Sequence, residues 1–332
     1  MNLTRLFKPK TIAVIGGGEW CKSIMSAAHQ IGYEGTILPI HPSGKEIAGI
    51  KSLKSLDAFP GLIDAAFIGV NRHATLDIVS KLSTLKAGGA TCFASGFSEA
   101  AAEDSIGANL QKKLVEAAGD MPILGPNCYG FLNAFDKCSI WPDQHGCREV
   151  DRGVAVLTQS SNIAINITMQ NRGLPIGYMI TCGNQAQTSQ ADVALHLLDD
   201  PRITSIGLHI EGFGNLRNWE KLAHKAHQKN IPIIVLKSGK SQQAKSAAIS
   251  HTATITGSDV GAQAFLDRLG IRRAESLPVF LEALKLNHQF GTLESNQIAS
   301  ISCSGGEAAL AADAVYGLSL IHISEPTRRR GI

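Results

Sequence analysis

One of the eleven histidines, His251, lies in a loop of small and hydroxylated residues that runs from Ser250 to Asp259. Few of these residues could pack in a core, so we expect an accessible imidazole surrounded by hydroxyl and backbone donors that suit a phosphate. This composition favours a histidine that accepts a phosphoryl group. The loop alone leaves open an alternative, a surface histidine in front of a helix whose N-cap is Ser258 or Asp259.

Two further loops could hold phosphate groups, because each follows a predicted strand and leads into a helix. Gly16-Gly17-Gly18 follows the strand 11–15, and Ser160-Ser161-Asn162 follows the strand 154–157. The free N–H groups of a helix N-terminus bind anions, and serine hydroxyls add donors. Simple explanations stay open here as well: the first loop could be an ordinary turn, and the second could only cap its helix.

The glycine turn also begins like a dinucleotide fingerprint, so a NAD(P)-dependent oxidoreductase is an alternative. Cys21, however, stands at the position of the third glycine, which in that fingerprint permits close packing of helix and strand. The second strand is followed by Lys45 rather than by an acidic residue about twenty residues after the glycines. A lysine suits a ligand phosphate better than a ribose diol, which weakens the NAD(P) alternative.

Composition bounds the class of protein. The 332 residues are 44% hydrophobic and 18% charged, which predicts a globular protein of two domains with part of a third. The net charge of +3 and an aromatic content of 5% argue against a nucleic-acid partner. The seven cysteines form no C-x-x-C pair, and neither a membrane-length apolar run nor a signal peptide is seen, so we expect a cytoplasmic protein with reduced thiols and no membrane partner.

Short apolar strands alternate with helices along the chain, which predicts an α/β fold with parallel sheets covered by helices on both faces. The expected strands are 11–15, 36–40, 65–70, 90–94, 154–157, 176–181, 205–210, 231–237 and 298–302. The expected helices are 22–31, 74–85, 101–118, 163–171, 190–198, 219–229, 277–287 and 307–314. The expected organisation is a first domain over 1–137, a polar linker over 138–152, a second domain over 153–290 and the start of a third over 296–318.

Taken together, these residues resemble the NDP-forming acyl-CoA synthetases, which are relatives of the succinyl-CoA synthetase α subunit. The likeness extends from about Leu6 to Leu318 and depends on several pieces in the family's order. These pieces are the opening 6–16, Ala94-Ser95-Gly96-Phe97, Gly125-Pro126-Asn127-Cys128-Tyr129-Gly130, Gln159-Ser160-Ser161, Gly183-Asn184, Asp199-Asp200-Pro201, Glu211-Gly212 and Ser250-His251-Thr252.

The resemblance implies a Rossmann-like CoA-binding domain, then a flavodoxin-like domain of the succinyl-CoA synthetase type, and then a third α/β domain. His251 would be the phosphorylated histidine, and Glu211 the carboxylate on its other ring nitrogen. The phosphohistidine would be cradled by Ser160, Ser161 and Asn162. The CoA site would be lined by Gly16, Gly17, Gly18, Lys45, Val70, Asn71, Ser95, Gly96, Phe97 and Asn127. No metal ligand is expected in this chain.

The activity implied is that of an acid–thiol ligase. A small carboxylic acid, coenzyme A and ATP would give acyl-CoA, ADP and phosphate, through a phosphohistidine and an acyl phosphate whose carbonyl carbon the thiol of coenzyme A attacks. ATP or ADP with Mg²⁺ would be bound by an ATP-grasp module in a longer chain or a separate subunit, and we expect a homo-oligomer. A CoA-sensing module or a protein acetyltransferase scaffold is the alternative, and the presence of His251 favours the ligase.

Several positions depart from the family pattern. Ala253 replaces the glycine of Ser-His-Thr-Gly, and Ser161 replaces the glycine of Gln-Ser-Gly. Trp20 is unusual in the first loop, and we expect it to shape the acyl or pantetheine end of the site. Residues 319–332 do not continue the third domain and look like translated adapter sequence, with a natural basic tail as the alternative.

Overall fold

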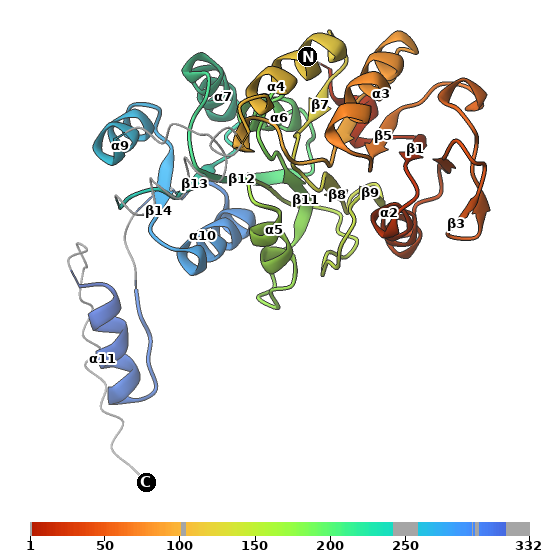
Figure 1. Cartoon of the computed structure of the whole chain (residues 1–332). Coiled ribbons are helices and arrows are strands. Elements are labelled where there is room, and N and C mark those ends of the chain that lie inside the picture. Colours follow the sequence, from red (N-terminus) through yellow and green to blue (C-terminus); the bar gives the residue numbers. More distant parts are fainter. Residues whose placement is uncertain (1, 101–103, 242–257, 294, 296–298, 317–332) are drawn as a thin grey trace. The chain divides into compact units, whose positions relative to one another are not determined.

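A computed structural model describes residues 2–100, 104–241, 258–293, 295 and 299–316. These residues fall into two units, Met1–Gly291 and Thr292–Ile332, and Figure 1 follows the chain through them. Within the described ranges, no helix combines the length and hydrophobicity that crossing a bilayer requires.

The first sheet contains five parallel strands in the order β2-β1-β5-β6-β7. Their bounds are Thr11–Ile15 (β1), Thr36–Ile40 (β2), Ala65–Ile68 (β5), Ala90–Cys92 (β6) and Ile123–Leu124 (β7). The two-stranded ribbon Glu46–Ile47 (β3) and Ile50–Lys51 (β4) follows β2. The chain thus builds outward from β1 in both directions, as in a doubly wound sheet.

Alternate residues of β1 enter different cores, which explains its unbroken apolar sequence. Ile12 and Val14 belong to the core on the side of the helix Glu19–Gln30, whereas Ala13 and Ile15 belong to the core beneath the helices Arg72–Thr84 and Gly107–Ala118. The helices of this half are Thr4–Phe7 (α1), Glu19–Gln30 (α2), Arg72–Thr84 (α3) and Gly107–Ala118 (α4), with short 3-10 turns at Leu56–Ala58 (η1) and Ser98–Ala100 (η2). The sheet is therefore covered on both faces, as predicted.

The second sheet has seven strands in the order β14-β13-β12-β10-β11-β8-β9. The parallel ones are Gly153–Thr158 (β10), Ile176–Thr181 (β11), Ile203–Ile210 (β12), Ile233–Lys237 (β13) and Arg272–Ala274 (β14). Numbered in chain order, these five repeat the arrangement 2-1-3-4-5 of the first sheet. Their helices are Ser161–Thr168 (α5), Gln190–Leu197 (α6), Leu216–Gln228 (α7), Asp259–Arg268 (α9) and Leu277–Phe290 (α10).

The predicted linker 138–152 is wrong in its first part. Phe131–Asn133 (β8) and Cys138–Ile140 (β9) form an antiparallel hairpin, and β8 pairs antiparallel with β11. The hairpin therefore forms the edge of the second sheet, although β8 lies within the range predicted for the first domain. Buried polar side chains in the hairpin, such as Asn133, hid these short strands from an analysis of hydrophobic pattern.

One of the hydrophobic cores extends across both sheets. A single buried cluster joins Phe7 and Val14 of the first half to Phe131 and Tyr178 at the edge of the second sheet. The amide of Asn133 adds a polar link, because its Nδ2 donates to the carbonyl oxygen of Phe7 at 2.9 Å and lies 3.1 Å from the Tyr178 hydroxyl. The larger unit is thus one body with two sheets.

The motif Asp199-Asp200-Pro201 is also part of this connection. Asp200 is buried, and its carboxylate binds Lys8 and Arg202, each through an ion pair of 2.8 Å. Arg202 reaches Asp136 as well, at 2.8 Å. These cations hold the pKa of Asp200 well below its ordinary value, although burial opposes them. We infer a structural role for this motif.

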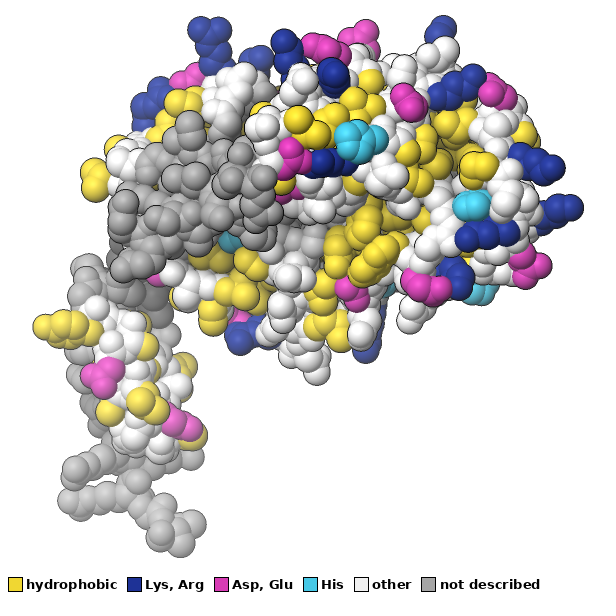
Figure 2. All heavy atoms as spheres, viewed as in Figure 1, with side chains coloured by type: hydrophobic (Ala, Val, Ile, Leu, Met, Phe, Trp, Pro, Cys, Tyr) yellow, Lys and Arg dark blue, Asp and Glu magenta, His cyan; other side chains and the backbone are white. Residues whose placement is uncertain are grey.

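The second unit contributes Gly305–Ala314 (α11). Ser304 caps this helix through a capping box with Glu307, in which Glu307 N donates to Ser304 Oγ at 3.2 Å. The described residues 299–302 form no strand, so the predicted strand 298–302 is not found there. On the face seen in Figure 2, lysine and arginine side chains of the larger unit are dispersed among acidic ones.

Candidate functional site

Both sheets reverse their strand order at one point, and loops from these two points line the same cavity. The reversal lies between β1 and β5 in the first sheet and between β10 and β12 in the second. Ligands of doubly wound sheets bind there, outside the carboxyl ends of the strands. The cavity has a volume of about 630 Å³, within the range of small-molecule sites. It is lined by Trp20, Gly69, Val70, Asn71, Arg72, Phe93, Ala94, Ser95, Asn127, Cys128, Tyr129, Gln159, Ser160, Ser161, Asn162 and Gly183.

The cavity brings together predicted residues from both halves of the chain. From the predicted CoA set it is lined by Val70, Asn71, Ser95 and Asn127, and from the predicted phosphate set by Ser160, Ser161 and Asn162. The other predicted residues of the described chain do not line it: Gly16, Gly17, Gly18, Lys45, Gly96, Phe97 and Glu211.

The glycine loop after β1 is held next to the cavity but contributes mainly through Trp20. Gly16 has a φ of 128°, and a Cβ there would come within 2.6 Å of the Gly69 carbonyl oxygen, so only glycine fits. The ammonium group of Lys45 donates to the carbonyl oxygen of Gly17 at 2.9 Å. Lys45 and the loop therefore bind each other, and the lysine would have to leave Gly17 to contact a ligand.

Cys21, at the third position of the glycine fingerprint, is a packing residue. It is buried, and its sulfur lies 3.7 Å from the carbonyl oxygen of Ile15. Burial raises the pKa of this thiol to about 11, which keeps it protonated and unreactive near neutral pH. The small sulfur side chain thus serves the close approach of α2 to the sheet that glycine would otherwise permit.

The loop Ser95-Gly96-Phe97 is occupied by the protein itself. The carboxylate of Glu99 accepts hydrogen bonds from the backbone N–H groups of Gly96 at 2.6 Å and Phe97 at 3.2 Å, and it also accepts one from Asn184. The Phe97 ring is fully buried. Of these three residues only Ser95 lines the cavity, and the N–H groups of Gly96 and Phe97 that were expected to bind CoA are already bound to Glu99.

The N-terminus of α3 supplies polar groups to the cavity. Asn71 caps the helix, with its Oδ1 accepting from the N–H groups of His73 and Ala74 at 3.1 and 3.0 Å. The cap leaves the Asn71 amide as a donor toward a ligand. Arg72, which the sequence did not single out, also lines the cavity and pairs with Asp104 at 2.5 Å.

The loop after β10 forms the second polar wall of the cavity, and hydrogen bonds from Thr158 hold it in place. Ser160 is the N-cap of α5, and the Thr158 hydroxyl both accepts from Ser160 N at 3.0 Å and donates to Ser160 O at 3.1 Å. Nδ1 of the buried His209 lies 3.0 Å from the same hydroxyl. Burial lowers the pKa of His209 to about 4, so the imidazole that supports this loop is neutral at pH 7.

Glu211 lies beside this loop, directly after β12. Its backbone N–H donates to Gln159 Oε1 at 2.6 Å, and its carbonyl oxygen accepts from the ammonium group of the buried Lys237 at 3.2 Å. His251 lies outside the described residues, so its pairing with Glu211 stays a prediction. Ser258 is the N-cap of α9, where its Oγ accepts from Gly261 N at 2.9 Å.

Three aromatic rings form another part of the cavity wall. The Trp20 ring centroid lies 5.2 Å from that of Phe93 and 6.1 Å from that of Tyr129, and the last two lie 5.8 Å apart. Trp20 is 45% exposed. The sequence singled out Trp20 alone, because Phe93 and Tyr129 reach it only through the fold.

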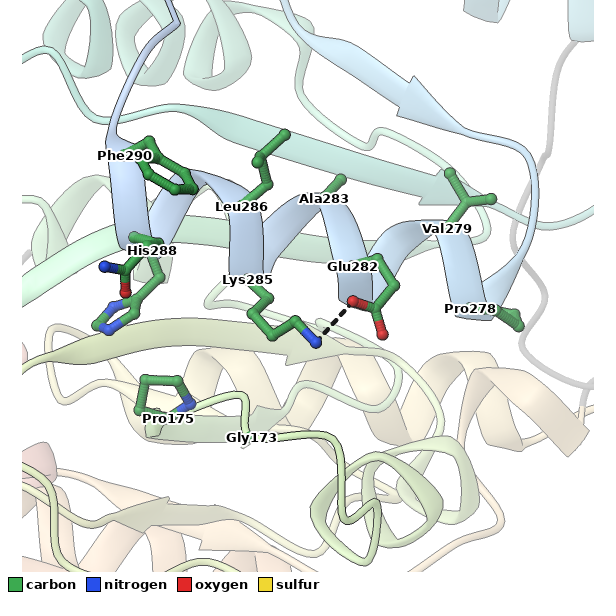
Figure 3. A pocket seen from close by; sticks show the side chains of 11 residues that line it. Gly173, Pro175, Pro278, Val279, Glu282, Ala283, Lys285, Leu286, His288 and Phe290 are labelled. Carbon is green, nitrogen blue, oxygen red and sulfur yellow. Dashed lines mark ion pairs between the residues drawn. The ribbon is translucent and has the colours of Figure 1, made fainter. Parts of the chain in front are cut away.

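A second cavity, of about 900 Å³, runs along α10 (Figure 3). Its wall is mostly apolar, with Val279, Leu286 and Phe290 partly exposed, and Lys285 of this wall pairs with Glu282 at 2.8 Å. It lies away from the loops at the strand reversals, and none of the predicted site residues that the structure describes line it. The smaller cavity is therefore the candidate site, although the α10 cavity is larger.

Comparison with known protein families matches both halves of the chain. A model described as a CoA binding domain matches residues 10–134, and one described as a succinyl-CoA ligase like flavodoxin domain matches residues 151–287. The chain thus resembles a CoA binding domain in its first half and a succinyl-CoA ligase like flavodoxin domain in its second.

Individual relatives and a solved structure are similar to this chain over both halves. The chain is 27% identical over 335 residues to a trans-feruloyl-CoA synthase from an unknown prokaryotic organism, covering 98% of this chain and 47% of the relative. It is 29% identical over 344 residues to the alpha subunit of ADP-forming acetate–CoA ligase II from Pyrococcus furiosus, covering 98% and 71%. The structure of acetyl-coenzyme A synthetase 1 from Ca. Korarchaeum cryptofilum with phosphate and ADP matches with a TM-score of 0.83 and 26% identity, covering 95% of this chain and 68% of that one.

The chain is therefore a relative of the ADP-forming acyl-CoA synthetases, and the predicted resemblance and fold class are confirmed. It spans about half the length of several curated relatives that it matches. Some relatives are separate alpha subunits.

Proposed function

We propose that this chain is the CoA-binding and phosphohistidine portion of an ADP-forming acyl-CoA synthetase. The observation that carries the proposal is the single cavity at both strand reversals. Asn71, Ser95 and Asn127 offer polar groups from the CoA-binding half, and the Ser160 loop offers hydroxyls and a helix N-terminus from the other half. A thiol ester and a phosphoryl group could meet there.

The proposed reaction has three balanced steps. A ring nitrogen of His251 takes the γ-phosphoryl group of ATP and releases ADP. The carboxylate of the acid then attacks phosphorus, which forms an acyl phosphate and frees the imidazole. Finally the deprotonated thiol of coenzyme A attacks the acyl carbon and expels phosphate. Glu211 would stabilise the positive charge of the phosphohistidine, and Ser160, Ser161 and Asn162 would bind the phosphoryl oxygens.

Nucleotide and Mg²⁺ would be bound elsewhere. No group of three or more acidic, histidine or cysteine side chains suited to a metal ion is found among the residues that the structure describes. We propose that an ATP-grasp module, in a longer chain or in a partner subunit, supplies both. The separate alpha subunits among the relatives support the partner-subunit form. We also propose a homo-oligomeric protein of the cytoplasm, where its seven free cysteines would stay reduced.

Calorimetric titration of the chain with CoA and with NAD tests the first half of this proposal. We expect saturable CoA binding and no NAD binding. Asn71→Ser keeps a capping oxygen for α3 but removes the amide donor, so the Kd for CoA should rise by about fivefold. Asn287→Ser, on α10 outside the cavity, is the matched control and should not change it. NAD binding without CoA binding would favour the oxidoreductase alternative.

Phosphorylation of the chain tests the second half without the ATP module. In the reverse direction, phosphate cleaves acyl-CoA to acyl phosphate and CoA, and the acyl phosphate then phosphorylates the histidine and releases the acid. The chain and radiolabelled phosphate, with acetyl-CoA or benzoyl-CoA as the acyl donor, should give acid-labile, base-stable protein label that His251→Ala abolishes. CoA binding together with label on another residue, or with no label for any acyl-CoA tried, would favour a CoA sensor or an acetyltransferase scaffold.

A further inference from the structure

The proposed reaction does not use the aromatic wall of the cavity. Aromatic residues make up only 5% of the sequence, yet three of them, Trp20, Phe93 and Tyr129, line this cavity together. Large apolar side chains that line a cavity and stay partly exposed are typical of ligand sites. Trp20 is 45% exposed, so its ring has free surface to offer a ligand.

A second layer of aromatic rings holds the wall in place. Phe67 and Trp141 are fully buried, and their ring centroids lie 5.5 Å from Phe93 and 5.8 Å from Tyr129, respectively. Phe93 and Tyr129 are thus packed between this layer and Trp20, and they lose little further freedom when a ligand binds. The wall is apolar and suits a flat apolar group that can stack on or pack against ring faces.

The position of the wall identifies the part of the ligand that would reach it. The rings share the cavity with Ser160, Ser161 and Asn162, where the proposed phosphoryl transfer takes place. The adenine of CoA is separated from its thiol by the whole pantetheine arm. The group next to the reacting centre is thus the acyl group.

We propose that Trp20, Phe93 and Tyr129 form the acyl-binding wall and that the substrate is a planar aromatic carboxylic acid. This inference rests on the function proposed above and names its substrate class. A small acid such as acetate would leave most of the wall without contacts, whereas an aryl group would cover it. Packing against these rings thus selects the acid. The polar loops of the cavity bind CoA and phosphate.

The chain itself can be tested with CoA, acetyl-CoA and benzoyl-CoA as probes in calorimetric titrations. We expect benzoyl-CoA to bind at least about tenfold more tightly than acetyl-CoA, because it adds ring contacts that acetyl lacks. Benzoyl-CoA should also change the protein fluorescence. The change should come from Trp20, because the other two tryptophans, Trp141 and Trp219, are at most 1% exposed.

Three variants separate the role of the ring from folding. Trp20→Ala should remove the preference for benzoyl-CoA and leave the Kd of CoA unchanged. Trp20→Phe should keep most of the preference but lose the fluorescence change. Phe290→Ala removes a partly exposed aromatic ring from the α10 cavity and should change none of the three affinities. Thermal unfolding of each variant checks that the fold is retained.

The outcomes distinguish this inference from the function on which it rests. Binding of CoA with no preference for benzoyl-CoA over acetyl-CoA would overturn the acyl wall and leave the synthetase proposal standing. Equal weakening of all three ligands by Trp20→Ala would assign the ring to pantetheine and also overturn the inference. Absence of CoA binding by the folded chain would overturn both.

Discussion

Acid should destabilise the protein at the Ser160 loop of the cavity, because a buried neutral histidine supports this loop. His209 is buried, and its Nδ1 lies 3.0 Å from the Thr158 hydroxyl, which in turn holds Ser160 on both sides. The hydroxyl donates to Ser160 O, so the neutral tautomer with a proton on Nδ1 completes the network. Protonation of His209 would place a positive charge in a buried position, and unfolding would expose that charge to water.

The magnitude follows from the difference in pKa between the two states. Burial lowers the pKa of His209 from 6.5 to about 4 in the folded protein. Between these values the unfolded chain binds more protons, so the stability is complete above pH 6.5 and is lost as the pH falls toward 4. The expected loss between pH 7 and pH 5 is about 2 kcal/mol, and the full loss below pH 4 is about 3 kcal/mol.

A variant that cannot titrate isolates this contribution. Asn places an amide donor near the position of Nδ1, so His209→Asn should keep the bond to Thr158. Urea unfolding of both proteins at pH 7, 6 and 5, followed by the fluorescence of the buried Trp141 and Trp219, measures the free energy of unfolding. The parent protein should lose about 2 kcal/mol more than the variant between pH 7 and pH 5. Equal losses would show that His209 is not held neutral by burial, and the reasoning would be refuted.

Three other changes test separate parts of the structure. Gly16→Ala should destabilise the protein by about 2 kcal/mol or more, because its Cβ would meet the Gly69 carbonyl oxygen at a φ of 128°; an unchanged urea midpoint would contradict this. Asp200→Asn should cost about 2 kcal/mol, since it leaves two part-exposed cations without their shared anion, and calorimetric unfolding measures it. Glu211→Gln should slow phosphorylation of the chain by more than tenfold at an unchanged Kd for CoA; unchanged labelling would remove Glu211 from the mechanism.

Most of the parallel strands could be predicted from the sequence to within about two residues, although β14 was missed and no strand is found at the described residues 299–302. The predicted strands 11–15, 36–40 and 176–181 agree with β1, β2 and β11. The reason is that strands covered on both faces are apolar at nearly every position and are bounded by glycine and polar turns. Helix starts were less accurate: α2 begins at Glu19 instead of residue 22, because Gly18 caps it without a side chain that signals the start.

The site could be predicted as a set of loops but not as a set of contacts. Strand ends rich in glycine, serine and asparagine pointed to the edge of each sheet where the cavity lies, and seven predicted residues line that cavity. The sequence could not show that Glu99 occupies the N–H groups of Gly96 and Phe97, because that contact depends on the path of a single loop. Arg72, Phe93 and Tyr129 were missed for the same reason.

The β8–β9 hairpin also limits how proteins of this architecture can exchange parts. The two family matches end at residue 134 and begin at residue 151, so β9 belongs to neither of them. A recombination event at that apparent boundary would join β11 to a foreign edge strand, or leave its backbone N–H and C=O groups unpaired and prone to intermolecular pairing. Exchange of the CoA-binding half between relatives is therefore favoured only when the crossover lies before β8, so that the second sheet keeps its own edge.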